Sequence, residues 1–355
     1  MKKILTLLLI ISLTISVFTS CKKEEVNEDQ TLKNRVTETL SSKIRLSFDE
    51  EGDFRILVIA DVHARGELPE MVSENIKELV DEEDPSLVIF TGDNTICSTE
   101  DELKASLNTM VGYIEEKQIP WCHVYGNHDD ESGLTKEEQQ SIYESYEYCI
   151  SKSGDESLSG VGNYVLPVYK NESEDIGFLV WCLDSGAYLS DSDKNSMLPF
   201  TGVTDYQGMP ESPYDYIKAD QINWYYNTSL DIERYYGEKI NSVMAFHIPL
   251  QETYYAWENR GDLTYTGEKN DFVGASMINS GLFYSLLSRQ DVKAVVNGHD
   301  HTNDFMVEYA GIKLCYAPTV STVDYYQFNL IGGRVFKINQ DNTDNVETYV
   351  NHLFG

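Results

Sequence analysis

The feature that most constrains the fold of this chain is an alternation of apolar, strand-like runs with segments of helical periodicity. The runs FRILVIA (54–60), SLVIF (86–90) and PWCHVY (120–125) are separated by residues 67–82 and 99–117. Both separating segments carry apolar side chains at the spacing of one helix face. Parallel strands require a crossover connection, so this order predicts an α/β domain with a largely parallel sheet.

After residue 136 the pattern is less regular, but strand and helix signals continue. Short apolar runs bounded by turn residues predict further strands, and the last part of the chain is rich in such runs. The stretches 185–215 and 251–278 show no clear periodicity and are predicted to be irregular. The run KIRLSF (43–48) precedes a DEEGD turn and is expected to form a hairpin with FRILVIA.

The N-terminus has the form of a processing segment. MKKILTLLLIISLTISVFTSC (1–21) joins two lysines, an apolar run from Ile4 to Phe18 and small residues before Cys21. This order resembles a bacterial lipoprotein signal, in which residues 1–20 are removed and Cys21 is lipidated. An ordinary secretory signal and an uncleaved anchor are the alternatives. We expect a lipoprotein of the cell envelope, held at the membrane through Cys21, with residues 21–42 as a tether and 43–355 as one domain.

Charge limits the partners of the chain. The sequence has 27 Lys and Arg against 59 Asp and Glu, for a net charge of -32. Such a chain repels polyanions at long range, so extended nucleic acid is not expected as a partner. An anionic substrate then needs a local cation, such as a metal ion. The cysteines other than Cys21 form no CxxC motif and are interpreted as small buried hydrophobic residues.

Polar residues of metal-ligand type follow the predicted strands. In chain order they are Asp61, His63, Asp93, Asn127, His128, His247, His299 and His301. Each alone is compatible with a turn, a helix cap or a core histidine, but five of the seven histidines occupy these positions. Ligands of α/β sheets gather at the carboxyl ends of strands, and alternate side chains of an extended segment point the same way. We therefore interpret His299 and His301 as metal ligands, within a metal centre formed by these strand ends.

The five motifs D-x-H, G-D-N, G-N-H-D, H-I-P and G-H-D-H, in this order, resemble the calcineurin-like metallophosphoesterase superfamily. The resemblance covers roughly residues 53–340. The flanking pieces LVWCLDSGAY, FHIPLQE and VKAVVNGHDHTNDF are similar to the purple-acid-phosphatase-related branch, which includes fungal and plant phosphatases. The resemblance implies a four-layer α/β/β/α sandwich of two mixed sheets, with the site along the sheet edges.

The resemblance also implies a ligand set for two metal ions. One ion would be held by Asp61, His63, Asp93 and His301, and the second by Asp93, Asn127, His247 and His299. Mixed imidazole, carboxylate and amide oxygen ligands suit Mn, Fe or Zn. Two such ions can generate a hydroxide at neutral pH and clamp a phosphoryl group for in-line attack.

Two neighbouring residues complete the predicted site. His128 is not needed as a ligand, and we expect it to donate a proton to the leaving oxygen or to hold a phosphoryl oxygen. Asp129 or Asp130 is the predicted orienting group for this imidazole. Purple acid phosphatases place a tyrosine ligand where this chain has Ile96, and usually glycine in place of His63, so no Tyr–iron chromophore is expected.

The leading hypothesis is a phosphatase that acts on a small-molecule or protein phosphomonoester. One alternative is a phosphodiesterase of the same superfamily. The other is a lipoprotein that binds a ligand or partner through its long loops and carries a vestigial site. No ligand position of the motifs is missing, which favours an enzyme over the binding protein.

Overall fold

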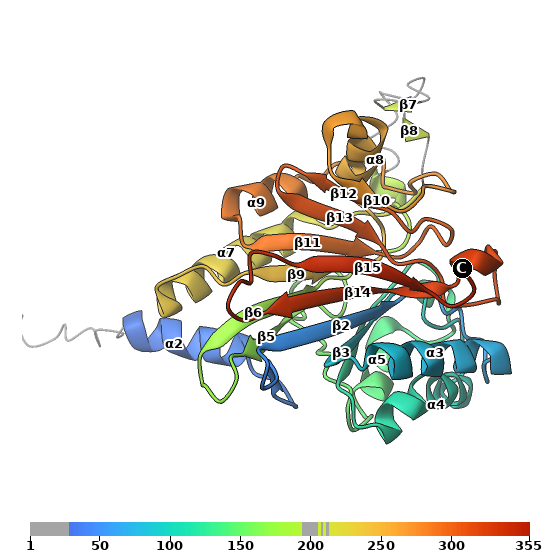
Figure 1. Ribbon diagram of the computed structural model, residues 1–355, viewed down its shortest axis with the longest axis horizontal. Coiled ribbons are helices and arrows are strands. Elements are labelled where there is room, and N and C mark those ends of the chain that lie inside the picture. Colours follow the sequence, from blue (N-terminus) through green and yellow to red (C-terminus); the bar gives the residue numbers. More distant parts are fainter. Residues whose placement is uncertain (1–27, 194–204, 207–208, 211–212) are drawn as a thin grey trace, which may run out of the picture.

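The computed structural model describes residues 28–193, 205–206, 209–210 and 213–355. The predicted signal peptide and Cys21 lie outside these residues. Two large mixed sheets pack against each other, and helices cover their outer faces (Figure 1). The prediction of an α/β fold built as a four-layer α/β/β/α sandwich of two mixed sheets is confirmed.

The smaller sheet contains the first three predicted strands. Its order is β15-β14-β2-β3-β4, in which β2, β3 and β4 are parallel and β14 and β15 are antiparallel. The strands are β2 (Asp53–Ile59), β3 (Leu87–Thr91), β4 (Trp121–Val124), β14 (Gly332–Asn339) and β15 (Glu347–His352). The helices that pack on this sheet are α3 (Glu70–Glu83), α4 (Glu100–Glu116) and α5 (Lys136–Tyr143). Buried apolar residues of α3 and α4 join one cluster with Leu57 and Ile59 of β2, so these helices cover the outer face.

The larger sheet has the order β1-β5-β6-β9-β11-β13-β12-β10. Its strands are β1 (Leu46–Ser47), β5 (Tyr164–Tyr169), β6 (Ile176–Cys182), β9 (Ser242–Ala245), β10 (Tyr265–Thr266), β11 (Val292–Asn297), β12 (Met306–Tyr309) and β13 (Ile312–Tyr316). The central strands β6, β9, β11 and β13 are parallel. Helices α7 (Ala219–Tyr236), α8 (Gln251–Glu258) and α9 (Leu282–Arg289) pack on the outer face through a second apolar cluster. The strands β7 (Asp205–Tyr206) and β8 (Met209–Pro210) form a separate pair.

The main core lies between the two sheets. Ile56 and Val58 of β2 share one buried cluster with Val243 of β9 and Val296 of β11. The intervening residues of β2 point to the opposite face, where α3 and α4 lie. Both faces of each central strand are buried, and this explains why the strands read as nearly continuous apolar runs.

Three segments differ from the sequence-based expectations. Strand β1 pairs in parallel with β5 of the larger sheet, so the predicted hairpin with β2 does not form. Helix α8 lies inside the stretch 251–278, which was expected to be irregular. Helix α2 (Glu28–Thr39) occupies much of the predicted tether and packs on α7, with Val36 buried and Arg35 paired with Asp231 at 2.8 Å. From residue 28 onward this segment therefore belongs to the folded unit.

Two further observations concern possible membrane-spanning helices and the cysteines. None of the described helices combines the length and the apolar character needed to cross a bilayer. The five cysteines after Cys21 are buried and form no disulfide among the described residues, as expected for small hydrophobic side chains. They are Cys97, Cys122, Cys149, Cys182 and Cys315.

Candidate metal centre

The polar strand ends of both sheets meet at one place. The loops after β2, β3 and β4 of the smaller sheet face the loops after β9 and β11 of the larger one. The side chains brought together here are all buried: Asp61, His63, Asp93, Asn127, His247, His299 and His301. Six of these seven belong to groups of side chains that could hold a metal ion, and Asn127 lies between Gly126 and His128, whose backbones approach Asp93.

The backbone at this cluster is unusual. Asp61, His63, Asp93 and His299 have positive φ angles of 55°, 52°, 49° and 80°. Non-glycine residues rarely adopt this left-handed region, and such residues concentrate at functional sites. Close packing of the loops also requires glycine at position 126, because a Cβ there would lie 2.2 Å from Oδ1 of Asp93.

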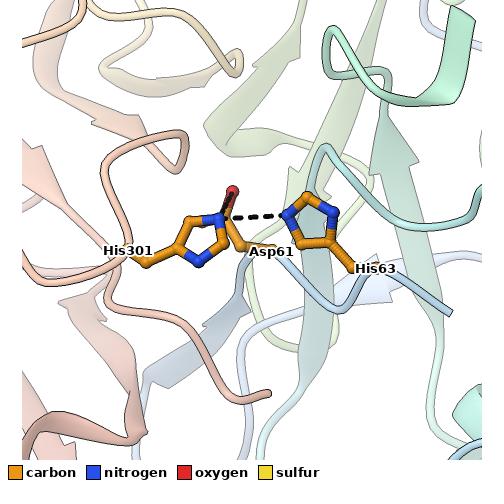
Figure 2. Close-up of side chains that lie close together, drawn as sticks. All are labelled: Asp61, His63 and His301. Carbon is orange, nitrogen blue, oxygen red and sulfur yellow. Dashed lines mark hydrogen bonds and ion pairs between the residues drawn. The ribbon is translucent and has the colours of Figure 1, made fainter. Parts of the chain in front are cut away.

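Asp61, His63 and His301 form the first group of donors (Figure 2). Nε2 of His63 lies 3.0 Å from Nε2 of His301, and the latter lies 3.7 Å from Oδ1 of Asp61. Nδ1 of His301 lies 2.7 Å from the carbonyl oxygen of Tyr325, so Nδ1 must carry the proton. The lone pair on Nε2 of the neutral ring then points at Asp61 and His63, as expected for a metal ligand.

Asp93, His247 and His299 form the second group. Nδ1 of His247 donates to the carbonyl oxygen of Thr91 at 2.8 Å, which leaves Nε2 of the neutral ring as an acceptor. This Nε2 lies 3.0 Å from Oδ2 of Asp93 and 3.2 Å from Nδ1 of His299. Acceptors that face one another at these distances need a cation between them, either a proton or a metal ion.

Asp93 connects the two groups, since it also forms a third group of possible ligands with His63 and His128. Its Oδ2 lies 3.0 Å from Nε2 of His247 and 3.7 Å from Nε2 of His63. Close by, the buried Oδ1 of Asn127 has no hydrogen-bond partner among the residues that the structure describes. A buried amide oxygen without a partner is costly unless a ligand satisfies it. The donor set therefore fits two metal ions that share Asp93, and its imidazole, carboxylate and amide groups suit Mn, Fe or Zn.

Burial and mutual charge shift the pKa values of these groups. Burial lowers the pKa of His63 to about 4, so this ring is neutral at physiological pH. Burial also acts to lower the pKa of His247, but the Asp93 carboxylate outweighs it and raises that pKa to about 9. Without metal, a proton on His247 is thus the cation beside Asp93. A metal ion would take the place of that proton.

His128 lies at the edge of the cluster and is more exposed than the predicted metal ligands. Its ring centroid is 5.1 Å from that of His63, and 31% of its side chain is exposed. The backbone N–H of His128 donates to Oδ1 of Asp93 at 2.8 Å, which fixes the residue relative to the metal ligands. This position is suitable for a group that protonates a leaving oxygen.

The prediction that Asp129 or Asp130 orients His128 is wrong. Asp129 is buried and accepts backbone N–H groups of Gly126 and Thr95 at 2.7 and 2.9 Å, so it joins the two loops that carry Asp93 and Asn127. Asp130 pairs with Lys136 at 3.4 Å. The carboxylate beside His128 is that of Glu131, whose Oε1 lies 3.0 Å from Nδ1.

Four residues near the cluster were not identified from the sequence. They are Glu131, Tyr188, Tyr214 and Tyr325. Glu131 follows two other acidic residues, and nothing in the sequence distinguishes the one that faces His128. The tyrosines lie in segments without motifs, in a chain that has 24 tyrosines.

Comparisons with known proteins show which family this chain resembles. The family description "Calcineurin-like phosphoesterase" matches residues 54–303. The chain is 30% identical over 303 residues to "Probable inactive purple acid phosphatase 29" of Arabidopsis thaliana, covering 77% of this chain and 73% of that protein. It is also 30% identical to "Phosphatase DCR2" of Saccharomyces cerevisiae, covering 74% of this chain and 46% of that protein.

Among solved structures, a dimetal phosphatase from Danio rerio superimposes with a TM-score of 0.49 and 16% identity, covering 85% of this chain and 99% of that chain. The family match includes the strands β2, β3, β4, β9 and β11, whose ends carry the clustered residues. The chain belongs to the calcineurin-like phosphoesterase family and is a hydrolase that acts on ester bonds.

Proposed function

We propose that this protein is a phosphomonoesterase that depends on two metal ions. The observation that carries the proposal is the position of Asp93, whose Oδ2 lies within 3.7 Å of Nε2 of both His63 and His247. When bound, two such ions would act as Lewis acids and would lower the pKa of the water that serves as the nucleophile. The remaining chemistry comes from side chains of this protein.

His128 protonates the leaving oxygen. It stands beside the first group of donors, and its partial exposure leaves it accessible to substrate. Oε1 of Glu131 lies 3.0 Å from Nδ1 of the ring, so we assign the exchange of a proton with the substrate to Nε2. Asp129 contributes indirectly, since its carboxylate binds the backbone of both ligand-bearing loops.

A monoester is a better match for the site than a diester. A monoester dianion carries more charge for two cations to neutralise, and a net charge of -32 offers no basic groove for a nucleic-acid strand. The yeast relative bears the name phosphatase. Three plant relatives bear the words "probable inactive", which keeps a binding protein as the second candidate. The enzyme is favoured by the six of seven predicted ligands that belong to groups able to hold a metal ion, and by the burial of the seventh, Asn127.

The test compares two esters with the same leaving group. We expect kcat/KM for p-nitrophenyl phosphate to exceed that for bis-p-nitrophenyl phosphate by at least tenfold with Mn²⁺ supplied. Asp93→Asn is the matched control, because it keeps the size of the side chain but removes the shared negative charge. A clear preference for the diester would indicate that the protein is a phosphodiesterase and not a phosphomonoesterase. No hydrolysis of either ester by metal-loaded protein would favour the binding protein.

The location of the enzyme is a further part of the proposal. The lysines, apolar run and small residues before Cys21 support a lipidated protein of the cell envelope that is held at a membrane. Its substrate would then be a phosphoester present at that membrane face.

A further inference from the structure

Three tyrosines border the metal centre, and each contacts a different predicted ligand. The hydroxyl of Tyr188 accepts from Nδ2 of Asn127 at 3.3 Å. The ring of Tyr214 meets that of His299 edge to face at 4.2 Å, and the ring of Tyr325 stacks on that of His301 at 4.1 Å. Tyr188 and Tyr325 are 41% and 47% exposed, so aromatic surface faces solvent beside a buried polar site.

Tyr188 and Tyr214 act as one unit. Their rings stack with centroids 6.0 Å apart and planes inclined by 26°, and an antiparallel bridge joins their backbones. We call these two residues the tyrosine pair. Contacts at both the backbone and the rings hold the pair in position, so a flat group could bind there with little loss of side-chain entropy.

The tyrosine pair and His128 are linked through Glu131. The Tyr188 hydroxyl donates to Oε1 of Glu131 at 3.0 Å, and that same oxygen lies 3.0 Å from Nδ1 of His128. His128 is the residue that we assign to the leaving oxygen. Because the tyrosine pair also contacts Asn127 and His299, we place the alcohol part of the substrate between His128 and this pair.

The surroundings of the tyrosine pair select against a negatively charged alcohol. A groove of about 1070 Å³ has Tyr188 in its wall and is also lined by several carboxylates, including those of Asp130, Glu137 and Glu156. The Lys136 ammonium in its wall donates to both oxygens of Asp184, at 3.0 and 2.9 Å. An anionic substituent would be repelled here, whereas an uncharged ring would gain contact with the tyrosines.

We propose that the tyrosine pair selects phosphomonoesters whose alcohol carries an uncharged planar aromatic ring. Such a ring occurs in the base of a nucleoside monophosphate or in an aryl-substituted alcohol. Either ring can stack on the tyrosine pair. The two kinds of substrate differ in the distance between the ring and the phosphorus atom, and this distance decides which of them the site prefers. This inference rests on the proposed phosphomonoesterase function and specifies its substrate class.

The test uses two pairs of substrates that differ only in the ring. Adenosine 5′-monophosphate and ribose 5-phosphate share the same primary alcohol, and only the first carries a base. In the second pair, 2-phenylethyl and 2-cyclohexylethyl phosphate differ in the planarity of the ring. We expect the wild type to prefer the aromatic member of at least one pair by about tenfold in kcat/KM, a size common for base–aromatic stacking. The first pair tests a ring that lies far from the phosphate, and the second pair tests a ring that lies close to it.

The variants assign any preference to the tyrosine pair. Tyr188→Leu and Tyr214→Leu should each bring the ratio close to one, while Tyr188→Phe, which keeps the ring, should retain it. Tyr284→Leu is the surface control, since Tyr284 is 75% exposed on α9 and should leave the ratio unchanged. The inference would be overturned if the kcat/KM ratios were close to one in the wild type, or if they were unchanged in both leucine variants. In either case, hydrolysis of ribose 5-phosphate would still support a phosphomonoesterase. Absence of hydrolysis of all four esters by metal-loaded protein would overturn both proposals.

Discussion

Oδ2 of Asp93 lies 3.0 Å from Nε2 of His247, a nitrogen that is an acceptor in the neutral ring because Nδ1 donates to the carbonyl of Thr91. Two buried acceptors at this distance cannot coexist without a cation between them. The strand ends position these side chains, and their arrangement favours metal ions over a dry, uncharged interior.

Removal of the His128 imidazole should separate catalysis from metal binding. His128→Ala is expected to lower kcat by two or more orders of magnitude on an alkyl phosphate, because the poor leaving group is then not protonated. The content of bound metal and the melting temperature should stay near wild type. Unchanged turnover of the alkyl phosphate would exclude His128 from the mechanism.

Glu131 should act through His128. Glu131→Gln is expected to lower kcat about fivefold to tenfold, because the neutral amide holds the Nδ1 side of the ring less firmly than the carboxylate does. In a His128→Ala background the same substitution should have almost no effect, as double-mutant cycles show for coupled residues. Asp130→Asn is the control, since Asp130 pairs with Lys136. Additive losses in the double variant would contradict this role.

The buried His123 should make stability depend on pH. Burial lowers its pKa to about 3, while its Nδ1 lies 2.8 Å from the Ser151 hydroxyl and its ring stacks on Tyr143. Between pH 6.5 and 3 the unfolded chain binds the additional proton, so this residue lowers the free energy of unfolding as the pH falls through that window.

At pH 5 this loss amounts to about 2 kcal/mol relative to pH 7 for a histidine of ordinary unfolded pKa. His123→Phe keeps the stacking on Tyr143 but has no titrating group. The difference between wild type and variant in urea unfolding, measured at pH 7 and pH 5, should therefore change by about this amount. Parallel loss of stability in both proteins would show that His123 does not contribute.

The leader can be tested through its cysteine. Cys21→Ser should release the protein from the membrane fraction, because the proposed anchor is the lipid on Cys21 and not the apolar run. The control is the wild type expressed in the same cells, with cleavage after residue 20 confirmed by mass. A variant that is cleaved but still sediments with membranes would require another anchor.

The strands and their polar ends were predictable because both depend on local sequence. Strand β2 reads as an apolar run that ends at Asp61, and the same holds for β3 and Asp93. The partner of β1 was not predictable, since two residues carry no signal for pairing with a strand over a hundred residues away. The packing of α2 was not predicted because the helix has few apolar residues, and the sequence does not show that Val36 is buried.

The site was predictable to the extent that its residues follow strands. The ligands appear in motifs, but Glu131 is one of three consecutive acidic residues, and only the turn of the 3-10 helix Asp129–Glu131 brings its carboxylate to His128. The tyrosine pair depends on a bridge between distant loops, and no local pattern predicts that contact.

The most direct test of the dinuclear site is the number of metal ions bound by wild type and by two matched variants. Metal-free protein is supplied with Mn²⁺, Fe²⁺ or Zn²⁺, separated from unbound ions and analysed for metal content, while hydrolysis of p-nitrophenyl phosphate is followed in parallel. The wild type should bind two ions per chain and reach full activity only with both. Asp93→Asn should weaken both sites, because its carboxylate lies near His63 of one group and His247 of the other, whereas His301→Ala should mainly empty one. A single ion in fully active wild-type protein, or an Asp93→Asn variant that keeps both ions, would contradict the dinuclear site.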